Sequence, residues 1–296
     1  MPPMAELGRA QMRQGHSEVG RLLLWSRAIA LTFAIAALLA CWPCVAPAKS
    51  FEESIRSFFP GASPPSPPRL VLVFVDISGS IPQGDWRIYG STFESLVGSD
   101  DPHGRQPALT AASQGEPGDR LTLATISQAT LTGFAPVADG TLTNTGHVFP
   151  DREANRATLH RLRTAFAGLK TARPSNKTRI LDALNLSQQL IEQEVGRRYV
   201  IVLLSDMLED SEAADFERRA PTPALTQAII NRRRAEHLIP DLHRAQLYVV
   251  GAKAADAARY QAVESFWTRY FHEANAVLPI GAYGRAPIDF AEAWRR

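Results

Sequence analysis

The sequence predicts an α/β fold in which a doubly wound, mostly parallel β-sheet is flanked by helices. Two observations lead to this prediction. Continuous apolar runs rich in β-branched residues are typical of strands buried on both faces of a parallel sheet, and segments with helical spacing of their apolar residues separate these runs. Strands and helices that alternate in this way form a doubly wound sheet, whose binding site lies at the carboxyl ends of the strands. We expect strands at 69–76, 121–126, 199–204 and 247–250, and a short last strand at 277–280.

Five helices are expected in the segments that separate and follow these strands. The aromatic residues at 266–271 have helical spacing, which indicates the core face of the last helix. The polar stretches at 99–119 and 133–151 are rich in Gly, Pro, Asn and Asp, and we expect them to be loops. The expected helices cover residues 86–96, 152–169, 178–194, 223–236 and 254–273.

The first 48 residues have the pattern of a signal peptide or membrane anchor. No charged residue occurs at 28–48, and the core of this segment is apolar. Four arginines precede it, an arrangement that holds an N-terminus in the cytoplasm. We therefore expect the rest of the chain to be extracytoplasmic, either periplasmic or tethered to a bacterial membrane. The arginines are Arg9, Arg13, Arg21 and Arg27.

Three fates of this segment are consistent with its residues. The triplet Ala-Pro-Ala at 46–48 matches a small-x-small cleavage site, which would release a mature chain starting at Lys49. The tetrapeptide Leu-Leu-Ala-Cys resembles a bacterial lipobox, in which Cys41 would carry a lipid. An uncleaved anchor is the third fate, although Pro43 and Pro47 shorten the helix below the ~20 residues that span a membrane.

A proline-rich linker is expected at 49–68, followed by a single domain at 69–296. The stretch PGASPPSPP at 60–68 contains five prolines in nine residues, which indicates a stiff, extended spacer. The domain contains no cysteine, so it has no disulfide and its core must stabilise it. Its length is sufficient to bury a substantial core.

The charge balance argues against a nucleic-acid-binding protein. The chain has 32 Lys and Arg residues against 30 Asp and Glu residues, a net charge of +2. A protein that binds the phosphate backbone needs a basic field. We therefore expect no nucleic acid partner, and contact with a membrane only through the N-terminal segment or a lipid on Cys41.

Oxygen-bearing side chains follow two of the expected strands. The first strand ends in Asp76, with Ser78 and Ser80 after it, and the strand at 199–204 is followed by Asp206. Parallel strands bring their carboxyl ends to one edge of a sheet, so we expect Asp76 and Asp206 to converge. Thr178, at the start of an expected helix, can present its hydroxyl to the same point. Carboxylates and hydroxyls without nitrogen or sulfur suit a hard cation such as Mg²⁺.

These residues resemble the metal-ion-dependent adhesion site of the von Willebrand factor A domain family. The family pattern is Asp-x-Ser-x-Ser, then a Thr, then an Asp. Asp76, Ser78 and Ser80 match the first element, Thr178 matches the second and Asp206 the third. The resemblance covers residues from Arg69 to Ile280. It implies that these five side chains bind Mg²⁺ or Mn²⁺, that an Asp or Glu carboxylate of a protein partner completes the coordination shell, and that the protein is not an enzyme.

The chain departs from the family pattern in two places. The usual Gly-Gly before the Thr is replaced by Asn176 and Lys177, which places a cation beside the expected metal. The usual Thr-Asp-Gly is replaced by the sequence Ser-Asp-Met at 205–207. Glu209 and Asp210 follow, and they either restore negative charge near the site or are exposed acids of a loop. We favour the loop interpretation, because exposure is the default for charged residues.

Two other interpretations of the acidic residues remain open. In a metal-free scaffold, Asp76 and Asp206 would cap helices or pair with arginines. In a haloacid-dehalogenase-type phosphatase, Asp76 would be the nucleophile, and Asp206 with Asp210 fits the later acidic motif of that family. Such a phosphatase needs a second Asp two positions after its nucleophile as acid and base. Ser78 occupies that position, which argues against phosphatase activity.

Overall fold

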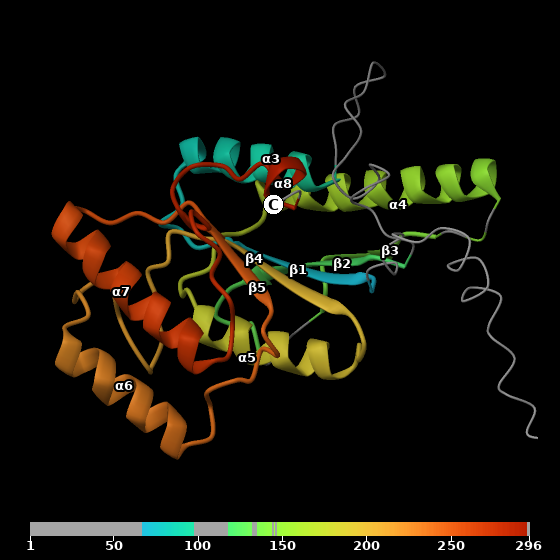
Figure 1. Cartoon of the computed structure of the whole chain (residues 1–296). Coiled ribbons are helices and arrows are strands. Elements are labelled where there is room, and N and C mark those ends of the chain that lie inside the picture. Colours follow the sequence, from blue (N-terminus) through green and yellow to red (C-terminus); the bar gives the residue numbers. More distant parts are fainter. Residues whose placement is uncertain (1–66, 98–117, 132–134, 144, 146, 295–296) are drawn as a thin grey trace, which may run out of the picture. The chain divides into compact units, whose positions relative to one another are not determined.

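The computed structural model describes residues 67–97, 118–131, 135–143, 145 and 147–294 (Figure 1). These residues belong to one unit of the chain, which extends from Pro65 to Arg296. The N-terminal 48 residues, most of the proline-rich linker and most of the expected loop at 99–119 lie outside the described residues. Among the described residues, no helix is long and apolar enough to cross a membrane.

The described chain forms an α/β fold around one six-stranded sheet, as expected (Figure 1). The strand order is β3-β2-β1-β4-β5-β6, and every neighbouring pair is parallel except β2 and β3. The strands are β1 (Arg69–Asp76), β2 (Arg120–Ile126), β3 (Ala138–Thr141), β4 (Arg198–Leu204), β5 (Gln246–Val250) and β6 (Tyr283–Gly284). The helices are α3 (Gln83–Val97), α4 (Val148–Leu169), α5 (Ile180–Glu192), α6 (Pro223–Ala235), α7 (Ala257–Glu273) and α8 (Phe290–Ala293).

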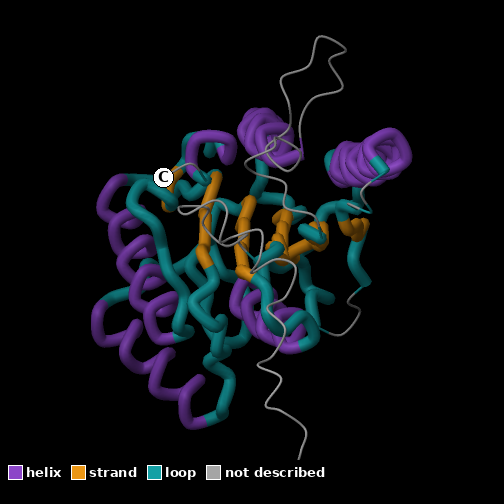
Figure 2. The backbone as a smooth tube through the Cα atoms, turned by 45° about the vertical axis from the view of Figure 1, so that its right-hand side comes forward, coloured by secondary structure: helices purple, strands orange, loops and turns teal. Residues whose placement is uncertain are grey.

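Helices cover both faces of the sheet (Figures 1 and 2). Side chains alternate between the two faces of a strand, and β1 is buried along its whole length. Its residues Leu70, Leu72 and Phe74 pack in the cluster that contains α5, α6 and α7. Its valines, at 71, 73 and 75, pack in the cluster that contains α3, α4 and α8. The continuous apolar run of β1 therefore reflects burial on two sides.

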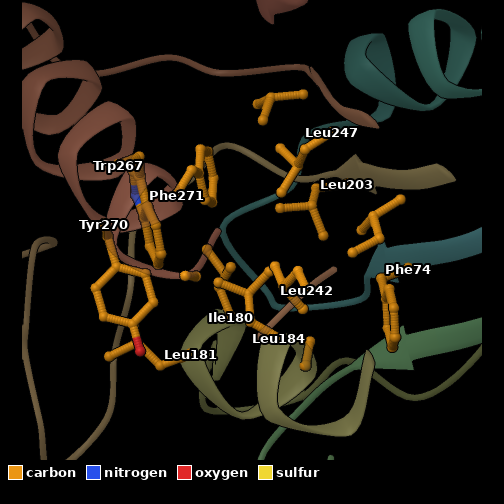
Figure 3. Close-up of a cluster of buried hydrophobic side chains, with 14 of the residues drawn as sticks. Phe74, Ile180, Leu181, Leu184, Leu203, Leu242, Leu247, Trp267, Tyr270 and Phe271 are labelled. Atoms are coloured by element: carbon orange, nitrogen blue, oxygen red, sulfur yellow. The ribbon is translucent and has the colours of Figure 1, made fainter. Parts of the chain in front are cut away.

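The first cluster contains the aromatic face of α7 that the sequence predicts (Figure 3). Phe266, Trp267, Tyr270 and Phe271 are each at most 1% exposed. Figure 3 shows Trp267, Tyr270 and Phe271 at one side of the cluster, with Leu203 of β4 and Leu247 of β5 at the other. The aromatic spacing thus marks the core face of α7, as predicted.

Two expected helix starts are corrected by the structure. The helix expected from Ala254 starts instead at Ala257, because the Asp256 side chain accepts a hydrogen bond from the amide of Arg259 at 2.8 Å and so caps the first turn. The helix expected from Thr178 starts at Ile180, so Thr178 lies in the connection before α5.

Two expectations at the edges of the sheet are wrong. The stretch at 133–151, expected as a loop, contains the antiparallel edge strand β3 and the start of α4. The last strand does not lie at 277–280, where Val277 makes only a single bridge to Gln246 and Ile280 is fully exposed. The chain makes a turn after Pro279 and then pairs with β5 through β6, again in the parallel direction.

Candidate functional site

The candidate site lies where β1 and β4 end side by side. The two strands are parallel neighbours, and Val75 is paired with Leu204. From this pair, strand order runs outwards in opposite directions, to β2 and β3 on one side and to β5 and β6 on the other. A crevice forms outside the strand ends at such a reversal, and it is the usual place for a ligand in open α/β sheets.

Four of the five expected site residues are connected by hydrogen bonds at this point. The amide of Ser78 donates to Asp76 Oδ1 at 2.8 Å. The hydroxyls of Ser78 and Ser80 lie 2.9 Å apart and share a hydrogen bond. Ser80 Oγ then donates to Asp206 Oδ2 at 3.0 Å, across 126 positions of the sequence. Both aspartates are buried, whereas Ser80 is exposed. The network therefore runs from the buried end of β1 to the protein surface.

Ser205, directly after β4, stabilises this network through two further hydrogen bonds. Its hydroxyl donates to Asp76 Oδ2 at 2.8 Å and accepts the amide of Met207 at 3.0 Å. Met207 has a φ of 67°, a backbone conformation that favours glycine. The Ser-Asp-Met sequence thus keeps the tight turn that a glycine would make, with the Ser205 hydroxyl as an additional hydrogen-bond partner. This role of Ser205 could not be predicted from its position in the sequence.

Thr178, the fifth expected residue, lies in the loop beside the other four. Ser175 pairs with the first turn of the site: its amide donates to the carbonyl of Ile77 at 2.9 Å, and its carbonyl accepts the amide of Gly79 at 3.2 Å. Three residues later, the carbonyl of Thr178 accepts the amide of Asp210 at 2.8 Å. The Thr178 side chain is 1% exposed. These bonds anchor the loop to the turn after β1 at Ser175 and to the loop after β4 at Thr178. Among the described residues, no hydrogen bond joins Thr178 to either aspartate.

Burial shifts the acidity of both aspartates in the same direction. It raises the pKa of Asp76 to about 7; the negative charge of Asp206 adds to the shift, and hydrogen bonds from Ser78 and Ser205 oppose it. Burial also raises the pKa of Asp206, whereas the amide of Leu208 and the charge of Lys253 lower it. Two neighbouring carboxylates in a buried site favour a bound proton or a cation.

Asp210 compensates the positive charge that Lys177 was expected to place beside the metal. Lys177 Nζ lies 2.6 Å from Asp210 Oδ1, so this ammonium group is paired with a carboxylate. A second cation, which the sequence did not reveal, contacts Ser80. Lys253 Nζ is 2.6 Å from Asp85 Oδ2 and 3.4 Å from the carbonyl of Ser80. Asp85 is 1% exposed, so Lys253 compensates a buried charge beside the site.

The interpretation of Glu209 as an exposed acid of a loop is wrong. Its side chain is 0% exposed, and Glu209 Oε2 accepts the amides of Ile180 at 2.8 Å and Leu181 at 3.1 Å. A carboxyl oxygen at this position satisfies two free amides of the first turn of α5. Glu209 therefore fixes the start of α5, and with it the loop that carries Thr178.

A buried hydroxyl beside the aspartates has no hydrogen-bond partner. Tyr89 is 0% exposed, and its Oη has no partner among the described residues. Burial raises the pKa of Tyr89, and the charges of Asp76, Asp206 and Asp85 raise it further. Gly251 leaves the space for this ring: a Cβ there would lie 2.5 Å from Tyr89 Cε1. A buried polar atom without a partner indicates a water or an ion that completes the site.

The donor set has the chemistry of a site for a hard cation. It consists of two carboxylates and three hydroxyls, all oxygen ligands of the kind that Mg²⁺ and Mn²⁺ prefer. In the described part of the chain, no group of three or more His, Cys, Asp or Glu residues is arranged to hold a metal. Any cation at this site would therefore depend on the serine and threonine hydroxyls as well as on the aspartates.

Comparison with known proteins gives similarity to solved structures only. No protein-family model and no curated protein matches the chain. A von Willebrand factor type A protein from Catenulispora acidiphila is 11% identical with a TM-score of 0.39, and the match covers 78% of this chain and 41% of that one. The manganese-loaded TRAP protein of Plasmodium vivax is 13% identical with a TM-score of 0.39, covering 78% of this chain and 72% of that one.

A third solved structure is the pilus adhesin SpaC from Lactobacillus rhamnosus GG in an open conformation. It is 14% identical with a TM-score of 0.41, and the match covers 77% of this chain and 29% of the adhesin. The chain thus spans less than half the length of two of these three proteins. The identities and TM-scores are too low to support a statement about function, so the assignment below depends on the residues of this chain.

Proposed function

We propose that this chain is a protein-binding module that captures an acidic side chain of a partner through Mg²⁺ or Mn²⁺. The metal ligands would be the five oxygen side chains of the site, and a partner Asp or Glu would complete the shell. The observation that carries the proposal is the hydrogen-bonded path from buried Asp76 and Asp206 to exposed Ser80. The ligands are Asp76, Ser78, Ser80, Thr178 and Asp206.

The bound metal would supply positive charge and an open coordination position at the surface. The chain's own residues prepare this position. Ser78 and Ser205 donate to the two oxygens of Asp76 and fix its orientation. The exposed turn at Ser80 leaves access for a side chain from outside. Lys253 contacts the carbonyl of Ser80 at the same turn and compensates the buried charge of Asp85, which reduces the repulsion of an incoming carboxylate.

We also propose that the module is extracytoplasmic and that it catalyses no reaction. The uncharged segment at 28–48, preceded by four arginines, favours an extracytoplasmic module. A phosphatase would need an acid and base at position 78, where the chain has a serine whose hydroxyl is bonded to Ser80. We therefore propose binding without turnover.

Divalent-cation titration of the full-length protein tests the metal site. Wild type is expected to gain several degrees of thermal stability in saturating Mn²⁺ or Mg²⁺, because a ligand that binds only the folded state stabilises it. Asp76→Asn should lose this gain. Asp139→Asn is the matched control, because Asp139 pairs with Arg120 at the far edge of the sheet, and it should keep the gain.

Two results would lead to other assignments. If neither cation changes the thermal stability of the wild type, the metal site is rejected and a metal-free scaffold remains. If the protein hydrolyses a generic phosphomonoester and Asp76→Asn abolishes the hydrolysis, the module is an enzyme.

A peptide-binding assay tests carboxylate capture. Retention of Glu-containing peptides in Mn²⁺, but not of their Gln counterparts, would support it, provided that EDTA abolishes the retention.

A further inference from the structure

A pocket of about 270 Å³ opens beside the candidate site. Its walls come from the turn after β1, the first turn of α3 and the end of α4. Most of the wall is apolar and consists of side chains that are at most partly exposed, apart from an exposed proline. These are Ile77, Ile81, Trp86, Leu169 and Pro174. We call this cavity the flanking pocket.

The flanking pocket and the candidate site share a wall. Ser78 and Gly79 line the pocket, and Ser78 also bonds to Asp76 and Ser80 in the site. Ser175 holds this shared turn in place through its bonds to the backbone of Ile77 and Gly79. A ligand whose carboxylate reaches the site at Ser80 therefore has its neighbouring groups at the mouth of the pocket.

Lysine side chains lie around the pocket and the site. Of the four lysines in the chain, three follow Arg69, and each of these lies near the shared turn. Lys170 lines the pocket, Lys177 follows Ser175 closely and bonds to it, and Lys253 contacts the carbonyl of Ser80. Lys170 is exposed and makes no ion pair within the described part of the chain. Lys177 and Lys253 are paired with Asp210 and Asp85, so Lys170 carries the positive charge that complements an acidic ligand.

We propose that the flanking pocket binds a large apolar side chain that lies next to the captured carboxylate in an acidic segment of the protein partner. This inference rests on the proposed function and specifies its partner: an Asp or Glu for the site, and an aromatic or branched aliphatic neighbour for the pocket. The apolar walls provide the contact area, and the shared wall sets the spacing between the two groups. Buried apolar anchors beside a charged contact commonly dominate the affinity of such interfaces.

Peptide selection on the full-length protein in Mn²⁺ tests this assignment. The probe is a library of short peptides with one fixed Glu and randomised neighbours. Wild type should enrich large apolar residues next to the Glu or one position further. Ala172→Trp fills the pocket from an exposed position of its lining and should weaken the best peptide about tenfold or more. The Mn²⁺-dependent thermal shift should stay unchanged.

The matched control is Arg173→Trp, which adds the same ring one residue further along, at an exposed position outside the pocket lining. It should retain the apolar preference of the wild type. If wild type retains Glu peptides without apolar preference, or if Ala172→Trp keeps the preference, the flanking pocket is rejected and the proposed function stands. If no peptide is retained in Mn²⁺, both the proposed function and this inference fail.

Discussion

Ser80 Oγ donates a hydrogen bond to Asp206 Oδ2 at 3.0 Å and so joins the turn after β1 to the end of β4. The two residues are 126 positions apart. Their contact exists because β1 and β4 are parallel neighbours and end at the same edge of the sheet. It makes the exposed serine and the buried aspartate parts of one site, so a substitution of either residue should perturb the position of the other.

Asp206→Asn should remove divalent-cation binding without unfolding the protein. The asparagine keeps an oxygen for the amide of Leu208, which bonds to Asp206 Oδ1 at 3.1 Å. It also removes the charge that raises the pKa of Asp76. We therefore expect the metal-free variant to match the wild type within about 1 kcal/mol or exceed it, and the Mn²⁺-dependent thermal shift to disappear. Thermal scans with Mn²⁺ and with EDTA measure both effects, and a full Mn²⁺ shift in the variant would exclude Asp206 as a ligand.

Ser205→Ala should destabilise the protein by about 1–3 kcal/mol, because it removes the donor to Asp76 Oδ2 and the acceptor of the Met207 amide in a buried position. Urea unfolding measures the loss. Ser187→Ala is the matched control: Ser187 is equally buried, and its hydroxyl donates to the Ala183 carbonyl within α5. The control should change stability by less than about 1 kcal/mol. Equal losses in the two variants would show that Ser205 has no special role.

Gly251→Ala should be more destabilising than Gly196→Ala. Both glycines have positive φ, 97° and 87° respectively, so each alanine introduces backbone strain of about 1 kcal/mol. A Cβ at position 251 would also lie 2.5 Å from Tyr89 Cε1, whereas position 196 is open. We expect an additional loss of about 1–3 kcal/mol for Gly251→Ala in urea unfolding.

The contact with Tyr89 can be separated from backbone strain by a second substitution. Tyr89→Leu in the Gly251→Ala background should recover part of the additional loss, because it removes the ring that the new methyl group meets. If the double variant is no more stable than Gly251→Ala alone, the closeness of the ring does not explain the requirement for glycine.

The strands and helices with strong patterns could be predicted from the sequence. The β-branched run of β1 and the aromatic spacing of α7 reflect burial that the fold confirms. The edge strand β3 was missed because its sequence, ADGT, is short and polar, and β-propensity is weak at an edge. Val277 is apolar, but it makes only one bridge before the chain turns.

The site could be predicted only as far as its residues follow strand ends. Asp76 and Asp206 were found because parallel strands bring their ends together. Lys253 was missed because it meets Ser80 across 173 positions, and no local pattern encodes that contact. Glu209 was misassigned for a similar reason: its partners are the amides of Ile180 and Leu181, and the default expectation for a charged residue is exposure.

Glu209 should make the protein less stable as the pH rises towards 8. Burial raises the pKa of Glu209 from 4.5 to about 8. Between these values the folded protein holds a proton that the unfolded chain has released, so the free energy of unfolding falls as the pH rises, by up to about 1.4 kcal/mol per pH unit. Below pH 4.5 both states are protonated, and above pH 8 both are ionised, so Glu209 adds no slope there. Urea unfolding at a series of pH values measures the slope.

Glu209→Gln isolates this contribution. The amide mimics the protonated carboxyl group: its oxygen can accept the amides of Ile180 and Leu181, and its NH₂ replaces the protonated Oε1, which has no partner among the described residues. The variant should lose the slope between pH 5 and 8 and be more stable than the wild type at pH 8. Glu212→Gln is the control, because Glu212 pairs with Arg179 at the surface, and it should keep the wild-type slope. A Glu209→Gln variant that is less stable than the wild type at pH 8 would mean that the first turn of α5 requires the charged carboxylate.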